Sequence, residues 1–282
     1  MYRFALFVAW FFSLFSFRML ERFANIATWV FFDICRFRRP LMLKNLDIAF
    51  PTEYTPAEKV VIARKSFSHF LQTILEVLIS KTHPIEKDVE VIGSDYLNEA
   101  LAQGQGSYIV AFHMGNWEAM GATITRRFRP AYTAVKKVGS TGLNQFVEER
   151  REQNGLYWLP RTSPGAAIKK MFQVLKDGNI VGFIMDQARP GEPRLPFFSQ
   201  TAKTNTSLAA IWLKRPAPVL VVCITRKAFG SHRLELQPAL ELQVTGNKEA
   251  DVLANSLIFN QAVERNVRKH PEQYFWFHNR WK

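Results

Sequence analysis

Along residues 40–282 the apolar positions follow two periods, one typical of buried strands and one typical of amphipathic helices. The expected strands are residues 89–92, 107–112, 132–136, 157–159, 180–185, 219–225 and 232–237. The expected helices are residues 55–80, 96–103, 117–127, 143–153, 163–178, 204–214 and 248–269, and residues 188–203 are expected to form a polar loop. Strands that alternate with helices predict a single α/β domain, with a mainly parallel or mixed sheet flanked by helices.

The N-terminal segment has a different pattern. Residues 4–17 are apolar and rich in aromatic side chains, and a second apolar stretch covers residues 23–32. Each stretch is shorter than the roughly 18–20 residues of a transmembrane helix, and no signal-peptide cleavage site follows the first. A basic cluster comes next, formed by Arg36, Arg38 and Arg39. We expect residues 1–39 to form a hydrophobic membrane anchor, either inserted in the bilayer or lying in its interface. The alternative is a pair of core helices in a soluble protein.

The central apolar strand, residues 107–112, ends at His113, and Gly115-Asn116 is a turn signal before the next helix. Glu118 then lies in the first turn of that helix. On one continuous helix His113 and Glu118 would point about 140° apart, but across a strand–turn–helix corner they can converge. A carboxylate on one imidazole nitrogen would leave the other nitrogen free to act as a general base. A structural histidine beside a helix-starting glutamate is the alternative, and a zinc site fits less well because a second histidine is missing.

Other candidate residues follow the later strands. Asp186-Gln187 comes directly after the apolar run 180–185, and such strand ends are where open α/β sheets bind ligands. Arg150 and Arg161 bracket the short strand 157–159, and either arginine can bind a phosphate group. Asp186 could instead hold one of these arginines, and each arginine could instead be a solvated helix-end cation.

Composition and missing motifs narrow the class of function. The formal charge of +13 in 282 residues indicates an anionic partner, such as nucleic acid, lipid headgroups or an acidic carrier protein. The basic residues are spread along the chain and no nucleic-acid-binding motif is present, which argues against nucleic acid. Cys35 and Cys223 give no disulfide framework, so a reducing compartment is expected. The sequence lacks the serine-hydrolase elbow, the P-loop and the dinucleotide fingerprint.

His113-x-x-x-x-Glu118 after an apolar strand resembles the H-x4-[D/E] motif of glycerolipid-type acyltransferases. Residues 40–282 resemble, more specifically, the late acyltransferases of lipid A biosynthesis, the lauroyl/myristoyl transferase family. The segments that carry the resemblance keep the family's order: residues 45–51, the helix from Thr55 with Glu76, residues 113–118, Arg150, Arg161, Asp186-Gln187, Phe197-Phe198, Ala202, Thr204, Arg226 and residues 271–276.

The resemblance implies a glycerolipid-acyltransferase-like catalytic domain at residues 40–282, held at the cytoplasmic face of a bacterial inner membrane by residues 1–39. It implies transfer of a fatty acyl chain from acyl carrier protein to a hydroxyl of a lipid A precursor, with His113 as general base oriented by Glu118. Residues expected to bind the substrate or the oxyanion are Asn116, Arg150, Arg161, Asp186 and Gln187. The implied partners are acyl carrier protein, an anionic glycolipid and membrane lipids, without nucleic acid, metal or cofactor.

The sequence departs from the family at Ala188-Arg189, where many relatives carry a second acidic residue, so contacts to the acceptor can differ. The alternative function is the same O-acyl transfer to another membrane lipid, such as a lysophospholipid, an aminolipid or another glycolipid. Relatives that acylate mannosides of phosphatidylinositol make this alternative concrete. A third hypothesis is a basic membrane-surface protein without catalysis, in which His113→Ala would leave the function intact.

Overall fold

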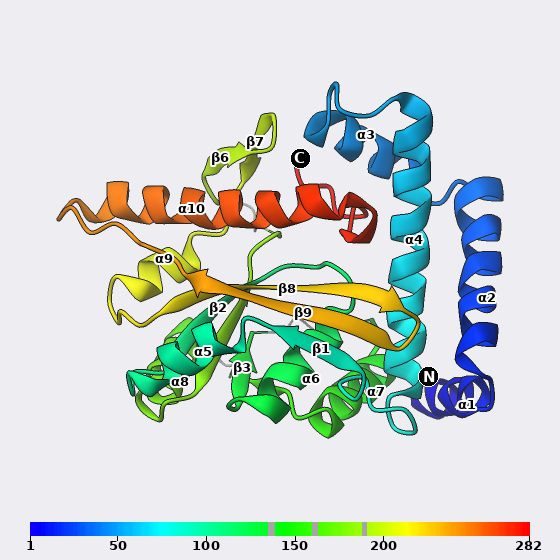
Figure 1. The fold of residues 1–282 in the computed structure, drawn as a ribbon, viewed down its shortest axis with the longest axis horizontal. Helices are drawn as coiled ribbons and strands as arrows, with labels where there is room; N and C mark the ends of the chain where they lie inside the picture. The colour runs from blue at the N-terminus through cyan, green and yellow to red at the C-terminus, as the bar shows by residue number, and fades with distance from the viewer. Residues whose placement is uncertain (135–138, 160–162, 188–190) are drawn as a thin grey trace.

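The computed structural model describes residues 1–134, 139–159, 163–187 and 191–282. Its main sheet has seven strands in the order β1-β9-β8-β2-β5-β3-β4 (Figure 1). Strands β8 and β9 pair antiparallel and all other neighbours in this sheet pair parallel, so the predicted α/β domain with a mixed sheet is confirmed. The strands are Val89–Ile92 (β1), Ser107–Ala111 (β2), Ala131–Thr133 (β3), Tyr157–Trp158 (β4), Ile180–Ile184 (β5), Val219–Ala228 (β8) and Ser231–Ala239 (β9).

Alternating residues of the central strands face two different cores. Tyr108 and Val110 of β2 face one core, which α3, α4, α8, α9 and α10 cover, whereas Ile109 and Ala111 face a second core beneath α5 and α6. Figure 1 shows α10 on one side of the β8–β9 hairpin and α5 and α6 on the other, with α4 across the end of the sheet. The helices are Arg39–Ala49 (α3), Pro56–Ile79 (α4), Ser94–Ala102 (α5), Trp117–Arg127 (α6), Thr141–Gln153 (α7), Pro164–Lys176 (α8), Ser207–Trp212 (α9) and Lys248–Lys269 (α10), followed by the 3-10 turn Pro271–Gln273 (η2).

The observed elements differ from the predicted ones in several places, including helix α3, which was not expected. The segment predicted as a polar loop contains a two-stranded antiparallel hairpin, Arg194–Phe197 (β6) with Gln200–Lys203 (β7). Phe197 and Ala202 of this hairpin are buried, so tertiary packing stabilises strands that the local polar sequence does not indicate. The strand expected at residues 132–136 ends at Thr133, and residues 135–138 lie outside the described part of the chain.

The first 39 residues form two helices of 12 residues each, Tyr2–Ser13 (α1) and Phe17–Thr28 (α2), followed by the π-helix Trp29–Ile34 (η1). In the described residues, no helix combines the length and the hydrophobicity needed to cross a bilayer. Helix α2 lies beside α4, and α1 contacts both α4 and α7 (Figure 1). Leu20 and Ala24 of α2 and Phe32 of η1 are buried. The segment predicted as an anchor thus forms short helices that pack against the α/β domain, and its binding to a membrane stays a prediction.

Candidate functional site

The corner at His113 is fixed by backbone contacts on three sides. Gly115 has φ +55°, and a Cβ atom there would lie 2.3 Å from the carbonyl oxygen of Ile224, so only glycine fits this turn. The Gly115 amide donates to the carbonyl of Gln273, and the Phe275 amide donates to the carbonyl of His113. The side-chain oxygen of Asn116 caps α6 by accepting from the amides of Glu118 and Ala119, at 3.1 and 3.0 Å. The C-terminal segment and the helix cap therefore hold the histidine in place.

Asp186 is the residue that orients the imidazole. Its Oδ1 lies 2.9 Å from His113 Nδ1, and its Oδ2 accepts the backbone N–H of His113 at 3.0 Å. Because a carboxylate only accepts hydrogen bonds, the proton of the neutral ring lies on Nδ1. The Nε2 atom then keeps a free lone pair. The Gln187 side-chain nitrogen lies 3.4 Å from Nδ1. The prediction that Glu118 orients the ring is therefore not met, although His113 and Glu118 do line the same cavity.

The pairing of β2 with β5 explains this arrangement. Ala111 pairs with Ile184, so the positions two residues beyond each strand, His113 and Asp186, come out side by side at the same sheet edge. The side chain of Asp186 is 2% exposed and that of His113 is 18% exposed, so the histidine alone of the two is open to a substrate. Burial by itself would lower the pKa of His113, but the charge and hydrogen bond of Asp186 outweigh it and raise that pKa above its ordinary value. Burial opposes ionisation of Asp186, yet His113 holds the pKa of this carboxyl below its ordinary value.

Glu118 pairs with Arg151, a residue that the sequence analysis missed. The Arg151 Nε donates to Oε2 of Glu118 at 2.9 Å and Nη2 donates to Oε1 at 2.5 Å, which is a bidentate ion pair. Their side chains are 10% and 14% exposed and both line the cavity beside His113. The neighbouring residue Arg150 had been the candidate, and one step along a helix turns a side chain by about 100°.

Two of the other predicted site residues point elsewhere, and one cannot be placed. Arg150 stacks 4.8 Å over the ring of Phe146 and donates to Gln153, so it does not line the cavity. Asn116 is fully buried and uses both ends of its amide within the protein, which removes it as a substrate contact. Arg161 lies outside the described residues, as do Ala188 and Arg189. In the part of the chain described, no three His, Cys, Asp or Glu side chains gather where they could hold a metal ion.

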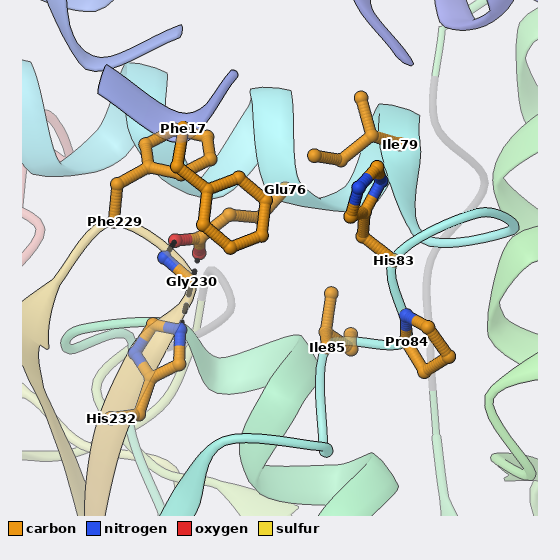
Figure 2. A pocket seen from close by; sticks show the side chains of 9 residues that line it. All are labelled: Phe17, Glu76, Ile79, His83, Pro84, Ile85, Phe229, Gly230 and His232. Carbon is orange, nitrogen blue, oxygen red and sulfur yellow. Dashed lines mark hydrogen bonds and ion pairs between the residues drawn. The ribbon is translucent and has the colours of Figure 1, made fainter. Parts of the chain in front are cut away.

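A buried ion cluster around Glu76 of α4 supports the corner, and Figure 2 shows its members Glu76, Gly230 and His232. The Glu76 carboxylate accepts from the Arg226 guanidinium, from the Gly230 amide at 2.7 Å and from Asn116 Nδ2 at 2.6 Å, and it lies 3.3 Å from His232 Nε2. Burial opposes its ionisation, but Arg226 and His232 hold the pKa of Glu76 at about 2. Since Asn116 caps α6, this charge fixes the helix that starts directly after the His113 turn. Figure 2 also shows Phe17 of α2 packed over the cluster beside Phe229.

An apolar cavity of about 100 Å³ opens beside His113 and runs between α6 and the sheet. His113, Glu118 and Arg151 line its polar end. Deeper lining residues come from the face of the sheet beneath α6 and from α6 itself: Ile109, Ala111, Ile180, Gly182, Ile184, Met120, Gly121 and Ile124. Trp117 packs edge-on against the His113 ring at 5.0 Å between centroids. An imidazole with a free ring nitrogen beside an apolar cavity suits a substrate with a reactive polar end and a hydrocarbon tail.

Comparison with known proteins identifies the family. The model of the family described as bacterial lipid A biosynthesis acyltransferase matches residues 2–282. The lipid A biosynthesis palmitoleoyltransferase of Escherichia coli (strain K12) is 25% identical over 253 residues, which cover 87% of this chain and 79% of that protein. The lipid A biosynthesis lauroyltransferase of the same organism is 23% identical over 255 residues, with the same coverage.

A relative with a different named acceptor is also found. The phosphatidylinositol mannoside acyltransferase of Mycobacterium tuberculosis (strain ATCC 25618 / H37Rv) is 21% identical over 248 residues, which cover 84% of this chain and 75% of that protein. All of these proteins are acyltransferases. With the family model matching nearly its whole length, the chain belongs to the bacterial lipid A biosynthesis acyltransferase family and is an acyltransferase.

Proposed function

We propose that this acyltransferase moves a fatty acyl chain from an acyl carrier protein thioester to a hydroxyl group of a lipid A precursor. The observation that supports this proposal is the His113–Asp186 pair at the mouth of the apolar cavity. The apolar cavity suits the hydrocarbon part of the acyl chain. The imidazole lies at the polar end of the cavity, where the carbonyl carbon of the acyl group would be attacked. The family supports lipid A as the acceptor.

In the proposed reaction, Nε2 of His113 takes the proton of the acceptor hydroxyl while the hydroxyl oxygen attacks the thioester carbonyl. Asp186 stabilises the resulting imidazolium and keeps Nδ1 protonated. The C–S bond then breaks, and the imidazolium returns its proton to the departing sulfur, so an ester and a free thiol are formed. Arg151, held by Glu118 at the cavity mouth, supplies positive charge for the oxyanion or for a phosphate of the acceptor.

We further propose that the N-terminal helices lie in the interface of the bacterial inner membrane, with the catalytic domain on its cytoplasmic side. In the described part of the chain, 15 of the 22 exposed large apolar side chains fall within the first 37 residues. Exposed arginines accompany them, including Arg18, Arg22 and Arg38. An apolar surface with adjacent cations suits insertion among anionic lipid headgroups. The overall charge of +13 favours the same membrane surface and an acidic carrier protein.

The experiment that tests the proposal is transfer of a labelled acyl chain by purified protein. Acyl carrier protein thioesters and acyl-CoA are compared as donors, and a tetra-acylated lipid A precursor, a lysophospholipid and a phosphatidylinositol mannoside are compared as acceptors. Transfer from acyl carrier protein to the lipid A precursor supports the proposal. The relative that acts on phosphatidylinositol mannoside favours the second candidate, acyl transfer to another membrane lipid, and transfer only to the other acceptors would establish it.

A further inference from the structure

One position in the wall that the sheet forms along the cavity carries no side chain, Gly182. Gly182 is the central residue of β5, between Val181 and Phe183, which face the opposite core. It pairs with Ile109 of β2 and Thr133 of β3, and all three line the cavity. A glycine inside a buried strand weakens it unless another group must approach the backbone closely. Here, the group that needs this space would be the ligand in the cavity.

The space above Gly182 is open. A Cβ atom added to Gly182 would meet only Thr133 Cβ and Tyr132 O, both at 3.9 Å, which is ordinary contact. Its backbone φ is not in the left-handed region, so a larger residue is compatible with the strand. A side chain at this position would therefore project into the cavity without disturbing its walls.

The position of Gly182 along the cavity follows from the strand register. Ile109 lies four residues before His113, and strands rise about 3.3 Å per residue, so the Gly182 row is about 13 Å below the level of the imidazole. The cavity continues past it to Ile180, Ala131 and Ile124. A group that fills the Gly182 position would block the cavity part of the way down and leave its mouth intact.

The opposite wall contains a second glycine, Gly121, and the side chain of Leu156 partly fills the space beside it. A Cβ atom on Gly121 of α6 would lie 2.4 Å from Leu156 Cδ2, so the leucine side chain occupies the space that this glycine leaves. Leu156 itself lines the cavity. Shortening Leu156 would enlarge the cavity, and enlarging Gly182 would shorten it.

We propose that Gly182 and Leu156 determine the length of the acyl chain that this enzyme accepts, an inference that rests on the proposed acyl transfer. The acyl chain passes over Gly182, and Leu156 against Gly121 limits the space beside it. A hydrophobic pocket distinguishes ligands by about 10- to 200-fold for each methylene group that does not fit. Substitutions at the two positions are then expected to move the length preference in opposite directions.

The test uses a ladder of saturated acyl carrier protein donors that differ by two carbons, with the preference read as the ratio of kcat/KM between donors. Gly182→Val is expected to move the optimum to shorter chains, with a loss of about tenfold or more for each methylene that no longer fits. Gly182→Ala should do the same more weakly, and Leu156→Ala should move the optimum to longer chains. Gly165→Ala is the control, because a Cβ at Gly165 has no neighbour within 4 Å and Gly165 lies outside the cavity.

A second measurement separates this inference from the proposed function. Free fatty acids of the same lengths compete with a fluorescent polyene fatty acid for the full-length protein, and this readout needs no transfer. Shifted binding without transfer by any variant would refute the proposed function and support the length determinant. An unchanged length profile in both readouts for Gly182→Val and Leu156→Ala would overturn the inference. Should Gly182→Val fail to fold, the comparison of Gly182→Ala with Leu156→Ala decides the matter.

Discussion

Replacing Asp186 by asparagine removes one charge while preserving the shape of the side chain. Oδ2 of Asp186 accepts a backbone N–H, a donor that cannot reverse its direction, so the amide oxygen of asparagine must take this place. The amide nitrogen then faces Nδ1 of His113, 2.9 Å away in the native protein. Because this nitrogen is a donor, Nδ1 must become the acceptor and the ring proton moves to Nε2. The imidazole is then in the tautomer that cannot accept a proton from a hydroxyl group.

The expected loss follows from this change of tautomer. In serine proteases the same substitution of a histidine-orienting aspartate lowers kcat by about 10⁴. We expect Asp186→Asn to lower kcat by about 10³–10⁴, which corresponds to about 4–5.5 kcal/mol of transition-state stabilisation. The KM for the acyl donor should change little, because Asp186 is buried and does not reach the cavity. The matched control is Asp177→Asn, since Asp177 is an exposed residue at the end of α8.

The pH profile gives an independent readout of the same pair. The proposed reaction requires neutral His113, so the acid limb of kcat/KM in the native enzyme should have its midpoint above the ordinary histidine value of about 6.5. Asp186→Asn removes the charge that raises the pKa of His113 and leaves the burial that lowers it, so the limb should move to lower pH. The reasoning is refuted if Asp186→Asn retains activity within tenfold of the native enzyme and keeps the native acid limb.

Glu118→Gln should lower kcat less than Asp186→Asn does, because Glu118 binds Arg151 and not the His113 ring. The substitution should cost about 1.5–3 kcal/mol of stability in denaturant titrations. A loss of kcat equal to that of Asp186→Asn would show that Glu118 also orients the imidazole. Glu76→Gln should cost about 3–5 kcal/mol of stability because it leaves the buried Arg226 without its carboxylate partner. Glu90→Gln, in an ion pair exposed to solvent, should change the stability far less. Equal stability of these two variants would show that the buried cluster does not support the fold. Replacing the exposed α1 residues Phe4, Phe7 and Trp10 together by serine should release the protein from anionic vesicles in flotation assays. Undiminished binding would place the membrane contact elsewhere.

The α/β architecture and the place of the site could be predicted because they depend on local pattern. His113 and Asp186 each follow a continuous apolar run, and the carboxyl ends of parallel strands share one edge. The sequence does not reveal that β5 pairs directly with β2, because the order of strands depends on tertiary packing. When the strand order is unknown, Glu118 is the obvious partner for His113 because it is the nearest carboxylate along the chain. The partner in space is Asp186, 73 residues away.

The remaining site residues depend on rotation and burial that no local pattern specifies. Arg150 and Arg151 are adjacent in sequence, and only the phase of α7 against α6 decides which one reaches Glu118. Glu76 lies within an amphipathic helix, where a carboxylate is usually exposed, and its burial depends on Arg226 and Gly230 from the distant β8–β9 hairpin. The polar hairpin β6–β7 is likewise stabilised by burial of Phe197 and Ala202.

Single-turnover acyl transfer to a hydroxyl acceptor tests the proposal that His113 is the general base of an acyl transfer. Native protein and His113→Ala are each mixed with labelled acyl carrier protein thioester and the tetra-acylated lipid A precursor, after equal melting temperatures have shown that both are folded. We expect transfer by the native protein and a loss of at least about 10³-fold in the variant, with binding of fatty acids retained. Comparable rates of transfer by the two proteins would contradict the proposal.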